Sequence, residues 1–162
     1  MTTLCSLGDD ILFGVQQEKR LLKYYLQKRH PKIIWNTKHN KFSPFDFQEG
    51  NRVFELKARQ YYKNRFDKEG HMCEPNKFKY LKDNPKLRGK IYFMYYDGLY
   101  VFDATDTEKL QRIQLRNGGR YDRGKDDQEK IQAYISGEDL KLVTRKLKTP
   151  KKYEDSDKCL ID

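Results

Sequence analysis

The feature that most constrains the fold is a pair of aromatic-rich runs at residues 90–104, "KIYFMYYDGLYVFDA". Tyrosine, phenylalanine and valine favour strands, and the Asp97-Gly98 pair between the runs is a typical two-residue turn. The segment therefore predicts a β-hairpin. Alternating aromatic residues in strands are usually core residues or cross-strand pairs, and we favour this interpretation over one in which they stack on bases.

The first third of the chain predicts one helix and three strands. Residues 9–29 carry apolar side chains at steps of three and four, and Pro31 follows them, so they predict a helix. Residues 32–36 predict a short buried strand. Residues 42–48 and 52–58 predict two strands joined by the turn signal "EGN". The apolar stripe of the predicted helix consists of Ile11, Leu12, Val15, Leu22, Tyr25 and Leu26.

The remainder of the chain predicts further elements and a tail. Residues 60–88 are polar and interrupted by glycine and proline, which indicates one or two short helices and surface loops. Residues 109–116 predict another strand, and residues 129–143 a strand that leads into a short capped helix. We expect one α/β domain over residues 1–143, with a mixed central sheet flanked by helices. A flexible tail, basic and then acidic, is expected over residues 144–162.

The charge of the chain indicates an anionic partner. The chain has 162 residues, of which 36% are charged, and its net charge is +10. An excess of positive charge of this size favours binding to a polyanion, most often nucleic acid. A lysine-rich surface without such a partner is the alternative that composition leaves open.

Signals for targeting, disulfides and zinc are weak. No run approaches the ~20 apolar residues of a membrane span, and the N-terminus does not resemble a signal peptide, so we expect an intracellular protein that binds no membrane. Cys5, Cys73 and Cys159 lie far apart and are odd in number, so they predict no disulfide framework. His71 and Cys73 form a short pair, but no second pair has zinc spacing, and we favour loop residues over a zinc site.

Charged side chains stand inside the two strands around "EGN". A two-residue loop at Gly50-Asn51 would pair Asp46 with Glu55 across the hairpin. Directly opposed residues of an antiparallel pair share a face, with Cβ atoms ~5 Å apart. Strand alternation places Lys57 on the same face, while the neighbouring apolar residues face the core. One face of the hairpin therefore carries two carboxylates and a lysine.

This combination is suited to phosphodiester cleavage. Two ionised carboxylates at such a distance repel each other, and a divalent cation such as Mg²⁺ or Mn²⁺ removes the repulsion. A nearby lysine can orient or help deprotonate a metal-bound water and offset the charge of a phosphate. Glu18 interrupts the apolar stripe of the predicted helix and could add a metal ligand if the helix packs on this sheet. The alternative is a solvated sheet face with Lys57 as a cross-strand partner.

The segment "SPFDFQEGNRVFELKAR" resembles the signature of the PD-(D/E)xK, or restriction-endonuclease-like, nuclease superfamily. The Asp of that pattern maps to Asp46, its acidic-x-Lys triplet to "ELK" at residues 55–57, and the Glu of its N-terminal helix to Glu18. The order of helix, three strands and helix is also similar. The resemblance covers residues 9–59. One departure is Phe45, which separates the proline from the aspartate.

The resemblance implies a fold, a reaction and a set of site residues. It implies a restriction-endonuclease-like core and a Mg²⁺- or Mn²⁺-dependent deoxyribonuclease. Asp46, Glu55 and the backbone carbonyl of Leu56 would hold the metal. Lys57 would position the attacking water, and Glu18 would complete the first metal site or help a second.

Basic residues in two other regions are predicted to contact the phosphates of DNA. One group directly follows the strand that carries Lys57, and the other flanks glycines that let the backbone approach a phosphate. Solvated surface residues are the alternative. The predicted contacts are Arg59, Lys63, Arg65, Arg116, Arg120, Arg123 and Lys125. The basic run at residues 145–152 is interpreted as duplex-binding, as a localisation signal or as part of a solubilising tail.

We interpret the chain as a metal-dependent DNA endonuclease. The sequence is compatible with a homodimer, because cutting both strands usually needs two sites, but no pattern requires one. The main alternative is a non-catalytic nucleic-acid-binding module with a basic surface. A packaging protein that coats nucleic acid, and a nuclease for RNA or single strands, are further alternatives.

Overall fold

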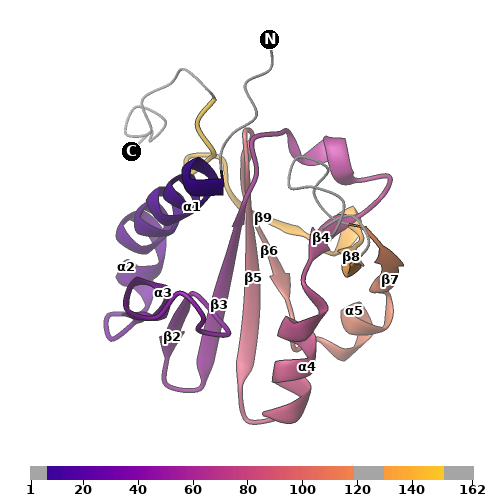
Figure 1. The fold of residues 1–162 in the computed structure, drawn as a ribbon, viewed down its shortest axis with the longest axis horizontal. Helices are drawn as coiled ribbons and strands as arrows, with labels where there is room; N and C mark the ends of the chain where they lie inside the picture. Colours follow the sequence, from indigo (N-terminus) through magenta and orange to yellow (C-terminus); the bar gives the residue numbers. More distant parts are fainter. Residues whose placement is uncertain (1–6, 119–129, 152–162) are drawn as a thin grey trace.

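The computed structural model describes residues 7–118 and 130–151, which form an α/β fold around a mixed sheet (Figure 1). Within these residues the main sheet has six strands in the order β1-β2-β3-β5-β6-β9. They are β1 (Ile34–Trp35), β2 (Phe47–Glu49), β3 (Arg52–Ala58), β5 (Arg88–Tyr95), β6 (Gly98–Asp103) and β9 (Lys141–Thr144). β3 and β5 run parallel, and the other neighbours are antiparallel. The expected α/β class with a mixed sheet is therefore confirmed.

A crossover connects the parallel strands β3 and β5, as parallel pairs require. It contains the 3-10 turn η2 (Lys63–Phe66), β4 (His71–Cys73) and the helix α4 (Pro75–Asp83). α4 begins with a proline, whose missing N–H is harmless in the first turn of a helix. β4 pairs with β8 (Ile131–Ile135), which pairs with β7 (Gln114–Asn117), so these strands form a second, smaller sheet.

The N-terminal helix agrees with the expected range of residues 9–29, but it presents a different face to the core. It consists of α1 (Leu7–Leu21), the π-helical turn η1 (Leu22–Leu26) and α2 (Gln27–Arg29). A π-helical turn inserts an extra residue, so the helix faces before and after it are out of phase. None of the described helices is long and apolar enough to cross a membrane.

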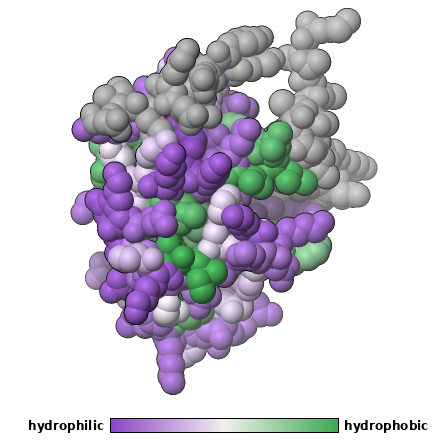
Figure 2. All heavy atoms as spheres, turned by 90° about the vertical axis from the view of Figure 1, so that its left-hand side faces the viewer, coloured by the Kyte–Doolittle hydropathy of each residue, from purple (hydrophilic) through white to green (hydrophobic). Residues whose placement is uncertain are grey.

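The phase change explains why half of the expected apolar stripe lies outside the core. Ile11, Leu12 and Val15 are exposed, whereas Gln17 and Arg20 of the same helix are buried. Only the part of the stripe after residue 21 contributes to the core, where Leu26 is fully buried. Figure 2 views the side of the molecule on which α1 and α2 lie, and hydrophobic side chains are visible there among hydrophilic ones.

The main sheet lies between two layers of other elements (Figure 1), with an apolar cluster on each of its faces. The N-terminal helix covers one face, and α4 with the small sheet covers the other. Successive side chains of β3 alternate between these layers, since Val53 belongs to one cluster and Phe54 to the other. The helix-side cluster includes Leu21, Leu26, Phe47, Phe54, Leu56, Tyr92 and Met94. The cluster on the α4 side includes Phe45, Val53, Leu81, Ile91, Phe93, Tyr95 and Phe102.

The hairpin of β5 and β6 is confirmed, but its turn is one residue earlier than expected. Tyr95 pairs with Gly98, so Tyr96 and Asp97 form the turn and Gly98 begins β6. Gly98 has a φ of +150°, and a Cβ there would lie 2.9 Å from the carbonyl oxygen of Thr144. The glycine is thus needed for close packing against the chain after β9 rather than for the turn.

Several elements of the second half differ from the sequence prediction. Residues 109–116 were expected to form a strand but fall in α5 (Thr107–Gln111), which Asp106 caps, and in β7. The 3-10 turn η4 (Gly137–Asp139) follows β8 as expected, with Ser136 as its cap. The helix α3 (Asn36–His39) and the strand β9 had no counterpart in the prediction.

The packed structure continues beyond the expected start of the tail. Leu147 and Thr149 are buried, and the Thr149 N–H donates to the Tyr95 carbonyl oxygen at 2.9 Å. The end of β5 therefore holds this segment through its own backbone. The last eleven residues of the chain lie outside the described residues.

Candidate active site

The candidate site lies beside β3, just before the first residue of β2. The predicted register is confirmed for three pairs, the last of which is Phe47 with Phe54. The ladder does not continue to the expected pair of Asp46 and Glu55. Instead, Asp46 Oδ2 accepts a hydrogen bond of 2.8 Å from the backbone N–H of Leu56. The aspartate side chain thus occupies the place that a longer β2 would have filled.

The two carboxyl groups are buried and interact. Asp46 is 8% exposed and Glu55 is 4% exposed, so the alternative of a solvated sheet face is wrong. Burial, with a smaller contribution from the negative charge of Glu18, raises the pKa of Asp46 to about 6. Burial also raises the pKa of Glu55 to about 8, although the ammonium of Lys57 opposes this. A side-chain hydrogen bond between the two carboxyl groups further raises the pKa of Glu55 and lowers that of Asp46.

Lys57 is held by Glu74, a residue that was not among the predicted site residues. Its Nζ lies 2.7 Å from Oε1 and 2.5 Å from Oε2 of Glu74, and 3.7 Å from Oε1 of Glu55. Burial alone would lower the pKa of Lys57, but the two carboxylates outweigh it and raise the pKa. Burial would likewise raise the pKa of Glu74, yet Lys57 lowers it to about 2. Lys57 is therefore a fixed ammonium that can orient water or a phosphate but cannot accept a proton.

A second lysine, Lys77 of α4, contacts the other oxygen of Glu55. Lys77 Nζ lies 2.8 Å from Glu55 Oε2, and it also donates to the carbonyl oxygen of Pro44. Glu55 Oε2 is nonetheless a buried atom without a well-aligned hydrogen bond, so the contact with Lys77 is mainly ionic. Glu74 is the N-cap residue of α4 and Lys77 is in its first turn, so the start of α4 covers the site. The sequence signal for both residues is "EPNK", in which a proline marks the start of a helix. The sequence prediction treated this stretch only as part of a polar segment.

Glu18 lies near the site but has partners of its own. Its Oε1 accepts hydrogen bonds from Trp35 Nε1 at 3.3 Å and from the Thr37 hydroxyl. Its charge still contributes to the raised pKa of Asp46. Among the described residues, no group of three or more His, Cys, Asp or Glu side chains is arranged to hold a metal ion.

The oxygen ligands beside the start of β2 fit a hard divalent cation that the protein coordinates only in part. Asp46 and Glu55 supply carboxyl oxygens, and the raised pKa of each reflects its burial. Mg²⁺ binds through one or two carboxylates and keeps several waters, so two protein carboxyls suffice. Asp46 and Glu55, with the carbonyl of Leu56, would hold such an ion.

The predicted DNA contacts fall into three groups. Arg59, Lys63 and Arg65 follow β3, and Lys63 is paired with Asp67 at 2.8 Å. Arg116 lies on β7, where its guanidinium stacks on the ring of Tyr134 at 4.0 Å. The remaining predicted contacts, Arg120, Arg123 and Lys125, lie outside the described residues.

The short His71 and Cys73 pair is part of the core rather than of a loop. Both residues are buried on β4. His71 Nδ1 lies 2.6 Å from the Tyr95 hydroxyl and Nε2 lies 2.8 Å from Asp67 Oδ1. Burial lowers the pKa of His71. Both ring nitrogens thus have partners inside the protein, which accounts for this histidine without zinc.

Comparisons with protein-family models, curated proteins and solved structures found no match.

Proposed function

We propose that the chain is a Mg²⁺- or Mn²⁺-dependent DNA endonuclease with a restriction-endonuclease-like core. The observation that carries the proposal is the cluster formed by the buried carboxyl groups of Asp46 and Glu55 and the largely covered ammonium of Lys57, beside the start of β2. The order of elements supports it. A helix precedes three antiparallel strands, and a crossover with α4 leads to β5, parallel to β3. The net charge of +10 is consistent with a DNA substrate.

The side chains have separate tasks in this proposal. Asp46 and Glu55 bind the cation, which when bound polarises the scissile phosphate and lowers the pKa of its water. The Lys57 ammonium orients the attacking water and offsets the charge that develops on the phosphate. Glu74 fixes Lys57 in place through two contacts of 2.7 Å and 2.5 Å. The raised pKa of Lys57 favours this positioning role over that of a base that deprotonates water.

A cleavage assay tests the proposal. Supercoiled, linear, branched and single-stranded DNA are incubated with the protein and Mg²⁺, Mn²⁺ or EDTA. We expect cleavage only with a metal, and we expect Lys57→Ala and Asp46→Ala to abolish it while DNA binding persists. Lys79→Ala, at an exposed position of α4, is the matched control and keeps full activity. Wild-type cleavage rates in both site variants would refute the site assignment. A homodimer would supply two such sites for cutting both strands.

A non-catalytic nucleic-acid-binding module is the second candidate. The contacts of Glu18 with Trp35 and Thr37 favour it, because they engage the side chain that the resemblance assigns to a metal. This candidate predicts salt-sensitive DNA binding without metal-stimulated cleavage.

A further inference from the structure

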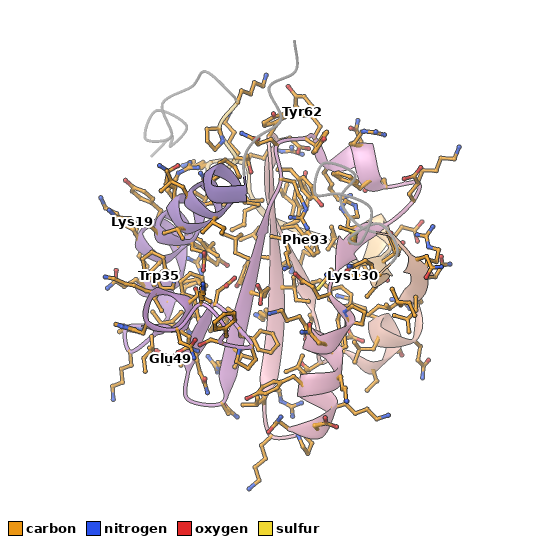
Figure 3. The ribbon with its side chains drawn as sticks, viewed as in Figure 1. Lys19, Trp35, Glu49, Tyr62, Phe93 and Lys130 are labelled. Atoms are coloured by element: carbon orange, nitrogen blue, oxygen red, sulfur yellow. The ribbon has the colours of Figure 1, made fainter. Side chains whose placement is uncertain are left out.

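Three distant chain segments meet at the end of the sheet that lies beyond Lys57. The Tyr96 N–H donates to the Tyr61 carbonyl oxygen at 2.9 Å, which aligns the chain after β3 with the turn after β5. The Thr149 N–H donates to the Tyr95 carbonyl oxygen at 2.9 Å and brings in the segment after β9. Figure 3 shows Tyr62 at this end of the molecule, well away from Phe93 in the middle of β5. We call Tyr61, Tyr62, Tyr96 and Lys151 the tyrosine edge.

The rings of the tyrosine edge are exposed and fixed in orientation. Tyr61 is 49% exposed and Tyr62 is 47% exposed. The ring of Tyr62 meets that of Tyr96 edge to face, with centroids 5.3 Å apart and planes at 74°. Tyr61 meets Phe66 in the same manner, at 5.3 Å and 81°. An edge-to-face contact covers at most one face of one of the two rings, and the exposed area of Tyr61 and Tyr62 remains open to a flat ligand.

Positive charge accompanies these rings. Lys151 Nζ lies 5.4 Å from the ring centre of Tyr62 and 5.9 Å from that of Tyr96. The nearby acidic groups are engaged within the protein, because Asp67 pairs with Lys63 and Asp97 accepts from the Lys63 N–H and the Tyr100 hydroxyl. Aromatic faces beside ammonium groups are what proteins use to hold unpaired bases and their phosphates.

We propose that the tyrosine edge stacks the unpaired bases of a nucleic-acid strand. Base stacking on aromatic rings tolerates any sequence, since every base has a flat face. The position relative to the cleavage site rests on the proposed nuclease function. Tyr61 follows Lys57 by four positions, so their Cα atoms are at most ~14 Å apart. Stacked nucleotides rise ~3.4 Å each, so the unpaired bases would lie within several nucleotides of the cut. Branched DNA and duplexes with single-stranded ends are the substrates that this geometry fits.

Binding measurements in EDTA test the proposal, because EDTA prevents metal-dependent cleavage during titration. Fluorescence anisotropy would report the affinity for a single strand, for a blunt duplex and for a duplex with an overhang. The loss of one stacking ring weakens single-strand binding by about five-fold or more. We therefore expect such a loss for Tyr62→Ala and Tyr61→Ala, with little change for the blunt duplex. Tyr62→Phe keeps the ring and should retain wild-type affinity.

Phe42→Ala is the matched control. Phe42 is 82% exposed and has the ammonium of Lys41 5.0 Å from its ring, but it precedes β2 and lies outside the tyrosine edge. Its loss should leave both affinities unchanged. Unchanged single-strand binding in both tyrosine variants would overturn the proposal. An equal loss for single strand and blunt duplex would also overturn it, since it would indicate general phosphate attraction. Unfolding midpoints equal to wild type exclude misfolding.

The same variants separate this proposal from the nuclease proposal. Tyrosine-dependent single-strand binding without cleavage by the wild type would support the tyrosine edge and refute the nuclease. The opposite result would be cleavage that depends on Lys57 together with single-strand affinity that is unchanged in Tyr61→Ala and Tyr62→Ala. It would support the nuclease and refute the proposal for the tyrosine edge.

Discussion

The buried carboxyl of Glu55 should make the metal-free protein less stable as the pH rises. Its pKa is about 8 in the folded chain, against an ordinary value of 4.5. Between these values the folded state holds a proton that the unfolded state has lost, so stability declines with increasing pH. A single proton corresponds to ~1.4 kcal/mol per pH unit, or about 3 kcal/mol between pH 5 and pH 7.

Glu55→Gln is the perturbation that isolates this effect, because glutamine has a similar shape and does not titrate. Urea unfolding in EDTA at pH 5, 6 and 7 would give the free energy of unfolding of the wild type and the variant. From pH 5 to pH 7, we expect the free energy of unfolding of the wild type to fall by about 3 kcal/mol relative to that of Glu55→Gln. This is equivalent to a difference of about 8 °C in Tm. The titration of groups that do not contact Glu55, such as His71, largely cancels in the comparison. Glu108→Gln, exposed on α5, serves as the control and should follow the wild type.

Divalent metal should reverse the effect, because a bound cation favours the ionised form of Glu55. Adding Mn²⁺ at pH 7 should stabilise the wild type in proportion to ligand occupancy and leave Glu55→Gln nearly unchanged. Parallel pH curves for the wild type and Glu55→Gln would refute the reasoning, because they would show that Glu55 titrates alike in the folded and unfolded chains.

Two further predictions concern the cover of the site and the small sheet. Lys77→Met removes a cation that lies 2.8 Å from Glu55 Oε2 and competes with a metal there, so calorimetry should show Mn²⁺ binding about ten-fold tighter. Lys79→Met, on the exposed side of α4, should bind as the wild type does, and weaker binding by Lys77→Met would contradict the assignment. Gly70→Ala should lower the free energy of unfolding by about 2 kcal/mol, because φ is +102° and the new Cβ would lie 2.8 Å from Tyr134 Cβ. Urea unfolding measures this loss, and stability equal to wild type would contradict it.

The hairpin that carries the site was predictable because local rules determine it. The turn at Gly50 has a φ of +58°, which glycine adopts without strain, and the turn sets the register of β2 and β3. Alternation along β3 then places Glu55 and Lys57 on one face whatever lies elsewhere in the chain. The same rules could not place Asp46, because β2 begins only at Phe47 and the Asp46 side chain, not its backbone, accepts the hydrogen bond from β3.

The cover over the site was not predictable, because contacts distant in the sequence create it. Glu74 lies 17 residues after Lys57, and only the path of the crossover brings the start of α4 onto β3. A local pattern identifies charged residues but not what is packed on top of them. The N-terminal helix illustrates the same limit. A single π-helical turn reverses which of its residues are buried, and the spacing of Ile11, Leu12 and Val15 gives no sign of that turn.

The net charge of the site depends on whether a metal is bound. Without metal at neutral pH, Glu55 holds its proton, so the ammonium groups of Lys57 and Lys77 balance the carboxylates of Glu74 and Asp46. A neutral cluster is the arrangement in which burial of four charged groups costs least. A divalent cation would favour the ionised form of Glu55, and the site as a whole would become more positive. In the proposed nuclease, a phosphate would therefore be attracted more strongly when the metal is bound.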